Sequence, residues 1–410
     1  MGARPGAVIR AARIAAGMTQ QQLGHALHCS ASTISRMETG TQSVDVPTRQ
    51  RLAGILRIPP ARLGITATVT TEPPGEDDVR RRELLTNLTL TAAAATAGLS
   101  VAPATAGTGS TSRIRDAMLG TGPLPSPTPP DRLTASLLAA IGDYDACRYT
   151  RLADTLPRLI TSAHAAGVDR ALAETYTLAT RFLIKLADPL GLIAGDRART
   201  YALGAGEPLL IGEAARNLAV LARREGWHSQ AANIAMHAAD GDALAGPDPA
   251  RAAERGLLLM SAAYTAAHAG DRAGMRDLTA QAAAIARGLG DGVLLRRHSG
   301  GFSPTVVQLH LISAEYTAGD PSAALAAARR LSPQALPTLE RRARYLTDIA
   351  RAYGMWGRRE ETVRALLAAE RVAPEETRAR PSVRALVSGL LATGRTSPEL
   401  RGLAVRCGLT

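Results

Sequence analysis

Hydrophobic residues in the first 40 positions recur every three or four residues, the spacing of helices with one buried face. The first helix is predicted to end at Gly17, and the capping-box sequence Thr19-Gln20-Gln21-Gln22 predicts the start of the second. After a break at His28-Cys29, Ser30 is a good N-cap for a third helix that is predicted to end at Gly40. The inward positions of the three helices are Val8, Ile9, Ala12, Ala15, Ala16, Leu23, Ala26, Leu27, Ile34 and Met37.

The third helix carries a short outer face of small and polar residues. Ile34 and Met37 lie three positions apart and face inward. The outward residues are Ala31, Ser32, Ser35 and Arg36. Such a face, on a helix that follows a tight turn, suits the major groove of DNA. Pro47 and the pair Pro59-Pro60 mark two further helices, so we expect a five-helix domain over residues 1–65.

From Asp131 onward, hydrophobic positions keep helical spacing without strand alternation, and glycine turns separate the stretches. We therefore predict an all-α fold, with residues 131–410 forming a solenoid of stacked helix pairs. The pairs are expected near 131–166, 171–203, 208–240, 253–288, 304–331 and 340–370, with terminal helices near 382–393 and 397–406. The concave surface of such a stack binds peptides, partner helices or small effectors, although the same fold can simply dimerise.

One of these pairs has the eight-position spacing of a tetratricopeptide (TPR) repeat. Its positions are Leu346, Ile349, Ala350, Tyr353, Thr362, Leu366, Ala369 and Pro374. The turn glycines Gly226, Gly270, Gly319 and Gly357 are 44, 49 and 38 residues apart instead of 34. We therefore predict an irregular, TPR-like solenoid.

Residues 66–130 are expected to be a linker, because residues 72–78 combine consecutive prolines with like charges. A helix is predicted at 79–99, packing on the second domain or on a dimer partner. Its sequence Arg80-Arg81-Arg82-Glu83-Leu84-Leu85 superficially resembles a twin-arginine export signal, but it follows a folded domain. The proline-rich stretch 121–130 is expected to be another spacer or an extended wrap.

The net charge of +12 changes this picture, because half of it lies in the first 65 residues. There, eight arginines oppose only Glu38 and Asp45, giving +6. Lys185 is the sole lysine of the chain, and the heavy use of Arg, Ala, Gly and Pro is typical of a high-GC genome. Such local concentration exceeds a general coding bias and favours a module that neutralises DNA phosphates.

Several classes of protein are excluded by the sequence. Cys29, Cys147 and Cys407 lack paired spacing, which indicates a reducing cytoplasm, and no apolar run is long enough for a membrane span. His25, His28 and Cys29 have no second ligand group nearby, so we expect no metal.

The sequence also lacks the motifs of common enzymes. Glycines 288, 290 and 292 follow a helix, not the strand of a dinucleotide loop. We find no catalytic motif and expect neither an enzyme nor a cofactor.

A set of residues within positions 8–63 has the spacing of a known family. Its members are Arg13, Gly17, Thr19, Gln20, Leu23, Ala26, Leu27, Ser30, Thr33, Ile34, Ser35, Arg36, Glu38, Gly40, Pro47 and Leu52. The set resembles the XRE (Cro and phage-repressor) family of helix-turn-helix (HTH) DNA-binding domains. The family tends to have Gly at the turn and Ala in the second helix, where this chain has His28 and Gly24, so we expect modest stability.

The resemblance implies which residues contact DNA. They are Gln20, Ala31, Ser32, Thr33, Ser35, Arg36, Thr41, Gln42 and Ser43. Gln20 would hold a phosphate, and Ala31, Ser32 and Arg36 would face base edges. Residues 41–43 would contact the DNA backbone. Arg13 and Glu38 would form an internal ion pair between the first and third helices.

Residues 301–310 and the run from 340 to 384 resemble the C-terminal parts of actinobacterial XRE regulators with TPR-like domains, and the resemblance spans most of residues 171–394. The chain has Ser303 and Val306 where that group tends to have Gly and Asn, so a ligand held by that Asn is in doubt here. Our candidates for an effector surface are Asn217, Asn233, His310 and Arg344. The two asparagines lie on the two helices of one predicted pair, and such amides hold peptide backbones in Gram-positive peptide-sensing HTH-TPR regulators. Alternatively, these side chains cap or pack helices.

The sequence therefore predicts a cytoplasmic, sequence-specific regulator of transcription that binds double-stranded DNA. We expect a homodimer on an inverted-repeat operator, controlled through residues 131–410 by a peptide, a small molecule or a protein partner. The alternative is a protein-interaction adaptor whose TPR-like surface does the main work and whose HTH is vestigial.

Overall fold

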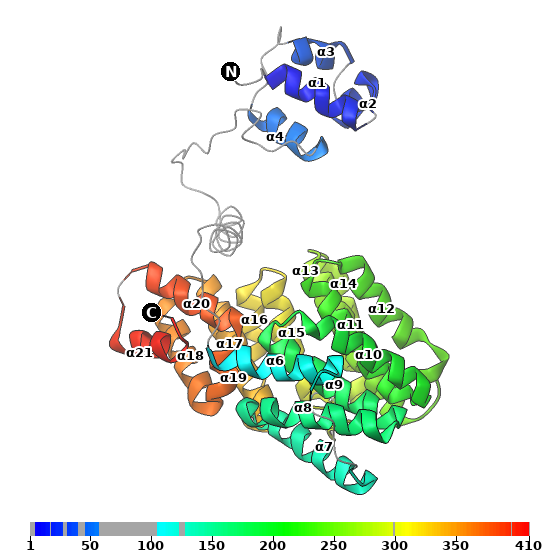
Figure 1. Cartoon of the computed structure of the whole chain (residues 1–410). Coiled ribbons are helices and arrows are strands. Elements are labelled where there is room, and N and C mark those ends of the chain that lie inside the picture. The colour runs from blue at the N-terminus through cyan, green and yellow to red at the C-terminus, as the bar shows by residue number, and fades with distance from the viewer. Residues whose placement is uncertain are drawn as a thin grey trace. The chain divides into compact units, whose positions relative to one another are not determined.

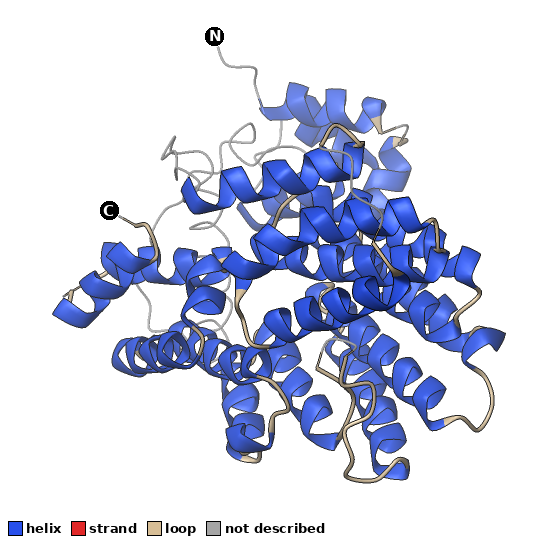
Figure 2. Cartoon of the chain, turned by 60° about the horizontal axis from the view of Figure 1, so that its bottom comes forward, coloured by secondary structure: helices blue, strands red, loops and turns tan. Residues whose placement is uncertain are grey.

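Helices make up the regular structure of the part of the chain that the computed structural model describes (Figure 2). That part comprises residues 5–16, 18–27, 31–39, 46–56, 105–122, 128–297, 300–394 and 396–409. An isolated bridge joins Leu294 and Phe302. The predicted all-α class is confirmed. Contacts divide the chain into a first unit, residues 1–75, and a second unit, residues 76–410.

The first unit has a small apolar core. Its described helices are α1 (Pro5–Ala15), α2 (Gln20–Ala26), α3 (Ala31–Thr39) and α4 (Val46–Ile55) (Figure 1). The core consists of Ile9, Leu23, Leu27, Ile34, Met37, Leu52, Ala53 and Leu56. The predicted capping box at the start of α2 is confirmed, since Thr19 Oγ1 accepts from the Gln22 N–H at 3.1 Å and Gln22 Oε1 from the Thr19 N–H at 2.8 Å. The fifth helix, expected near Leu63, lies outside the described residues.

Six consecutive helix pairs form the body of the second unit, close to the predicted ranges. They are α7 (Pro130–Asp145) with α8 (Tyr149–Ala166), α9 (Asp169–Leu186) with α10 (Leu190–Ala205), α11 (Pro208–Arg224) with α12 (His228–Asp240), α13 (Pro249–His268) with α14 (Arg272–Gly288), α15 (Pro304–Thr317) with α16 (Pro321–Arg329), and α17 (Leu339–Met355) with α18 (Arg359–Val372). They are followed by α19 (Pro374–Ala379), α20 (Pro381–Ala392) and α21 (Pro398–Arg406). Short 3₁₀ turns lie at Asp242–Leu244 and Pro333–Ala335. None of the described helices is long and apolar enough to span a bilayer.

The same turn closes the first helix of four of these pairs. The four turn glycines named above have φ between +71° and +85°, a conformation that favours glycine. In each turn, the N–H of the residue after the glycine donates to the carbonyl five residues earlier, as in Trp227 to Ala222 and Asp271 to Ala266, both at 2.9 Å. This is the Schellman arrangement. Identical turns give successive pairs a similar geometry, as expected of a repeat.

Helix α6 (Thr105–Leu119) corrects the predicted linker. Ile114, Ala117 and Met118 are buried in the same core as α7 and α8, and Arg113 pairs with Asp154 at 2.5 Å. Residues 105–119 therefore belong to the second unit. The mixture of Thr, Gly and Ser in α6 concealed three buried positions with helical spacing. The predicted helix at 79–99, with Arg80–Leu85, lies outside the described residues.

The first and last pairs of the stack contact each other, since α17 packs on α7 and α19 packs on α8 and α9. Buried polar groups join these elements. Lys185 of α9 pairs with Glu340 of α17 and, at 3.0 Å, with Glu376 of α19. The Tyr149 hydroxyl of α8 also donates to Glu376. We call this set the closure cluster. It holds the ends of the stack together around a common interior.

Candidate functional site

The outward face of α3 is the candidate DNA-reading surface. Ile34 is fully buried and Met37 is 8% exposed, so the core fixes the inner face of the helix. On the other side Ser32 and Arg36, four positions apart, are exposed. The predicted residues Ala31, Thr33 and Ser35 are half-buried, and Thr41, Gln42 and Ser43 lie outside the described residues. The structure therefore presents one serine and one arginine most openly.

A polar cluster of three residues fixes the position of α3. Arg13 of α1 donates to both carboxylate oxygens of Glu38, at 2.5 and 3.1 Å, so the predicted ion pair is present. Gln20 Nε2 donates to Glu38 Oε2 at 2.8 Å. Burial raises the pKa of Glu38, but the hydrogen bonds from Arg13 and Gln20 more than offset this, and the pKa lies below its ordinary value. The cluster ties α1 and the start of α2 to the reading helix.

The placement of Gln20 bears on its predicted phosphate contact. Its amide is half-buried against Glu38 at the first position of α2. An amide nitrogen carries two hydrogens, so Gln20 can serve Glu38 and still donate to a phosphate. The N-terminus of a helix also offers backbone N–H groups and a partial positive charge. The start of α2 is therefore suited to an anion.

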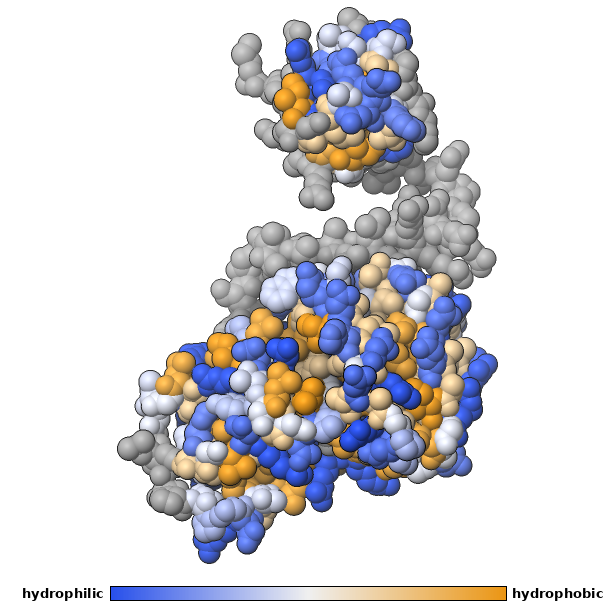
Figure 3. Space-filling model, turned by 90° about the vertical axis from the view of Figure 1, so that its right-hand side faces the viewer, coloured by the Kyte–Doolittle hydropathy of each residue, from blue (hydrophilic) through white to orange (hydrophobic). Residues whose placement is uncertain are grey.

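The second unit contains a half-open cavity of about 410 Å³. The first helix of every pair, from α7 to α17, contributes to its wall, and α20 adds Pro381 and Ser382. On the outer face seen in Figure 3, by contrast, hydrophobic residues lie in small groups among hydrophilic ones. The common interior of the stack is therefore the more distinctive feature of the described part of this unit.

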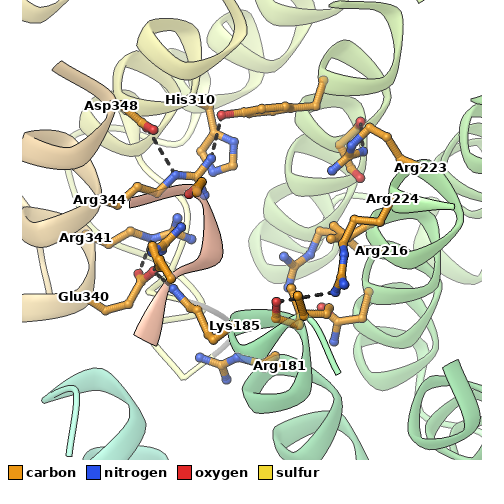
Figure 4. Close-up of a pocket in the computed structure, with 18 of the residues that line it drawn as sticks. Arg181, Lys185, Arg216, Arg223, Arg224, His310, Glu340, Arg341, Arg344 and Asp348 are labelled. Carbon is orange, nitrogen blue, oxygen red and sulfur yellow. Dashed lines mark hydrogen bonds and ion pairs between the residues drawn. The ribbon is translucent and has the colours of Figure 1, made fainter. Parts of the chain in front are cut away.

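The wall of the cavity is strongly cationic. Its positive side chains are Arg181, Lys185, Arg216, Arg223, Arg224, Arg341, Arg344, Arg351 and Arg380, and its carboxylates are Glu340 and Asp348. Figure 4 shows Arg341, Arg344 and His310 on one side and Arg216, Arg223 and Arg224 on the other. Further carboxylates, including Glu213 and Glu254, lie behind the wall and approach Arg216 at 3.5 and 3.7 Å.

Burial disfavours the charged forms of several side chains in and around the cavity. It lowers the pKa of Arg223 to about 10 and, with Arg223 and other cations nearby, that of His268 to about 4. Burial and then Arg344 hold the pKa of His310 well below its ordinary value, so this imidazole is neutral. Burial also raises the pKa of Asp145, a carboxylate 3.7 Å from Arg181, to about 6. At neutral pH Arg223 still carries its charge, whereas His268 and His310 do not.

Three of the four residues predicted for an effector surface come together in this cavity. Asn217, His310 and Arg344 line it from α11, α15 and α17. Asn233 does not line it and is exposed on α12, so the two asparagines do not act on one space. Val306 is fully buried and does not line the cavity either.

Sequence reasoning missed most of the arginines of the cavity. Arg181, Arg216 and Arg341 are less than 10% exposed. Arginine is common throughout this chain, so its presence alone gave no signal. Arg181 offered a usable signal, because it lies in an apolar stretch of the first helix of a pair, close to the buried Ala179 and Phe182. Arg341, which lies among other charged residues, offered none.

The described residues contain no group of three or more His, Cys, Asp and Glu side chains that could hold a metal ion. A search of curated proteins finds no match. Residues 6–63 match a family model described as a helix-turn-helix domain, which covers α1 to α4. The first unit of this chain therefore contains a helix-turn-helix domain, the type of domain by which many transcription regulators bind DNA.

Proposed function

We propose that the protein is a sequence-specific transcription regulator that places α3 in the major groove of double-stranded DNA. The observation that carries this proposal is the two-sided character of α3. Its inner face is fixed by Ile34, Met37 and the Glu38 cluster, while Ser32 and Arg36 face outward. A rigid helix with an exposed arginine is suited to bidentate contact with guanine. The charge of +6 on residues 1–65 adds affinity for phosphates.

We further propose a homodimer that binds an inverted repeat. One short helix reads few base pairs, and each good bidentate contact contributes only about 1–3 kcal/mol of discrimination. Two copies related by a twofold axis double the number of base pairs that are read, with half-sites about 34 Å apart. The stack of helix pairs, which resembles TPR repeats, would then serve dimerisation and control, with a binding role and no catalysis.

A selection experiment tests the proposal. Full-length protein is incubated with fragmented DNA of random sequence at ~150 mM salt, bound fragments are enriched, and the enriched site is footprinted. We expect protection of one site with twofold symmetry in excess competitor DNA. Uniform, salt-sensitive binding without an enriched site would contradict sequence-specific function. The alternative, a protein-interaction adaptor, would then remain. In that case a chain without residues 1–65 should still bind all the protein partners of the full chain.

A further inference from the structure

We propose that the cationic cavity of the second unit binds a phosphorylated small molecule of about nucleotide size. A role for this ligand in controlling DNA binding rests on the proposed function. The binding site itself follows from the geometry of the second unit alone.

The first argument is a half-buried cation that has no opposite charge beside it. Arg223 Nη1 donates to the Ser261 carbonyl and the Thr265 hydroxyl, both at 3.1 Å. Among the described residues no carboxylate lies within 4.0 Å of its guanidinium group. Partial desolvation without an opposite charge disfavours the charged form of this side chain, and its pKa is lowered to about 10. An anion in the cavity would supply the missing negative charge.

The second argument is a pair of buried polar groups without partners. Asn217 is 3% exposed, and its Nδ2 has no hydrogen-bond acceptor among the described residues. Both ring nitrogens of His310 are buried and equally without a partner there. Buried polar groups are almost always hydrogen-bonded, and these two line the same cavity. The neutral imidazole offers one donor and one acceptor, which suits the uncharged part of a ligand.

The third argument is the fixed geometry of the arginines. The guanidinium groups of Arg223 and Arg344 lie 5.4 and 5.5 Å from the centre of the Tyr264 ring, and Arg344 Nη2 donates to the Tyr264 hydroxyl at 2.7 Å. Arg344 is also 3.5 Å from Asp348. Both guanidinium groups are therefore positioned by the same tyrosine on the wall of the cavity. Guanidinium groups held in this way bind phosphate oxygens in a bidentate manner better than lysine does.

Charge and size select the class of ligand. Nine cations line the wall, and six carboxylates pair with them or lie beside them: Glu340, Asp348, Asp145, Glu213, Glu254 and Glu376. About three positive charges remain, more than a single carboxylate would neutralise. A volume of about 410 Å³ falls in the range of small-molecule sites and is larger than an inorganic ion requires. An organic phosphate with two or more negative charges satisfies both conditions, with Asn217 and His310 left for its organic part.

Calorimetric titration of the full chain, without DNA, tests the site. The probes are pyrophosphate, ATP, GTP and citrate at ~150 mM salt, which screens the basic first unit. We expect saturable binding of at least one of the three phosphates, tighter than that of citrate. Arg223→Gln and Arg344→Gln should each weaken it about 10- to 100-fold, the value of one charged hydrogen bond or two. Asn217→Ala should weaken the nucleotides more than pyrophosphate.

Two control variants keep the result specific. Arg199→Gln removes an exposed arginine of α10 outside the cavity, and Arg36→Ala removes one from the reading helix, and both should leave ligand affinity unchanged. If Arg223→Gln does not fold, Arg223→Lys keeps the charge, loses the planar fork and should still weaken binding.

The proposal is overturned if no phosphate binds at millimolar concentration, if citrate binds as tightly as the phosphates, or if the cavity variants bind like wild type. These outcomes differ from failure of the DNA-binding function, which the footprint measures without any ligand.

Discussion

At the scale of single residues, Arg36 is the side chain on which base selection depends most under the proposed function. Arg36→Ala should cost about 1–3 kcal/mol at the selected site and relax preference at one base pair. Gln20→Ala should instead weaken all sequences alike, because Gln20 would contact phosphate and also supports Glu38. Fluorescence anisotropy on the selected site and on single-base variants separates the two. Equal losses on every sequence for Arg36→Ala would remove this residue from base reading.

Glu38 is the residue that should make the first unit sensitive to acid. Its pKa is lowered in the folded state, so its contribution to stability is present above the unfolded pKa of about 4.3 and is lost as the pH falls through the folded value. Hydrogen exchange of the α3 amides in the full chain, corrected for intrinsic rates, should show falling protection below pH ~4.5. Glu38→Gln should lower protection at pH 7 and flatten this dependence, and an unchanged slope would contradict the assignment.

At the scale of elements, α6 should be an integral helix of the second unit. Ile114→Ala is expected to destabilise that unit by about 2–5 kcal/mol, because a fully buried side chain leaves a cavity. Leu119→Ala, at a residue of the same helix that is 61% exposed, should change stability by less than about 0.5 kcal/mol. Thermal unfolding followed by the fluorescence of Trp227 and Trp356 measures both. Equal stabilities of the two variants would contradict the assignment of α6 to the second unit.

Elements were predictable from the sequence where apolar spacing and glycine turns agree, as in the six helix pairs. The lining of the cavity was predictable only in part: Asn217, His310 and Arg344 were expected, but its other arginines were not. Asn217 and Asn233 looked equivalent because each lies on a helix of one pair, yet curvature of the stack turns only the first helix inward. Lys185 and Glu340 meet over a separation of 155 residues, and no local pattern reports such a contact.

At the scale of the whole molecule, the proposed homodimer makes two measurable demands. The full chain of 42.7 kDa should elute with about twice that mass in light scattering. Inserting about 5 base pairs between half-sites should abolish tight binding, because half a helical turn moves one site to the opposite face of the DNA. An insertion of about 10 base pairs is the matched control. A monomer that tolerates both insertions would contradict the proposed geometry.

The closure cluster has a consequence for biogenesis. Tyr149 leaves the ribosome 227 residues before Glu376, its hydrogen-bond partner. At about 5–20 residues per second, this interval lasts roughly 10–45 s. During this time the first pairs of the stack expose the surfaces that later meet α17 and α19. Nascent chains stalled before Glu376 should therefore engage chaperones. The closure cluster can form only when nearly the whole chain has been made.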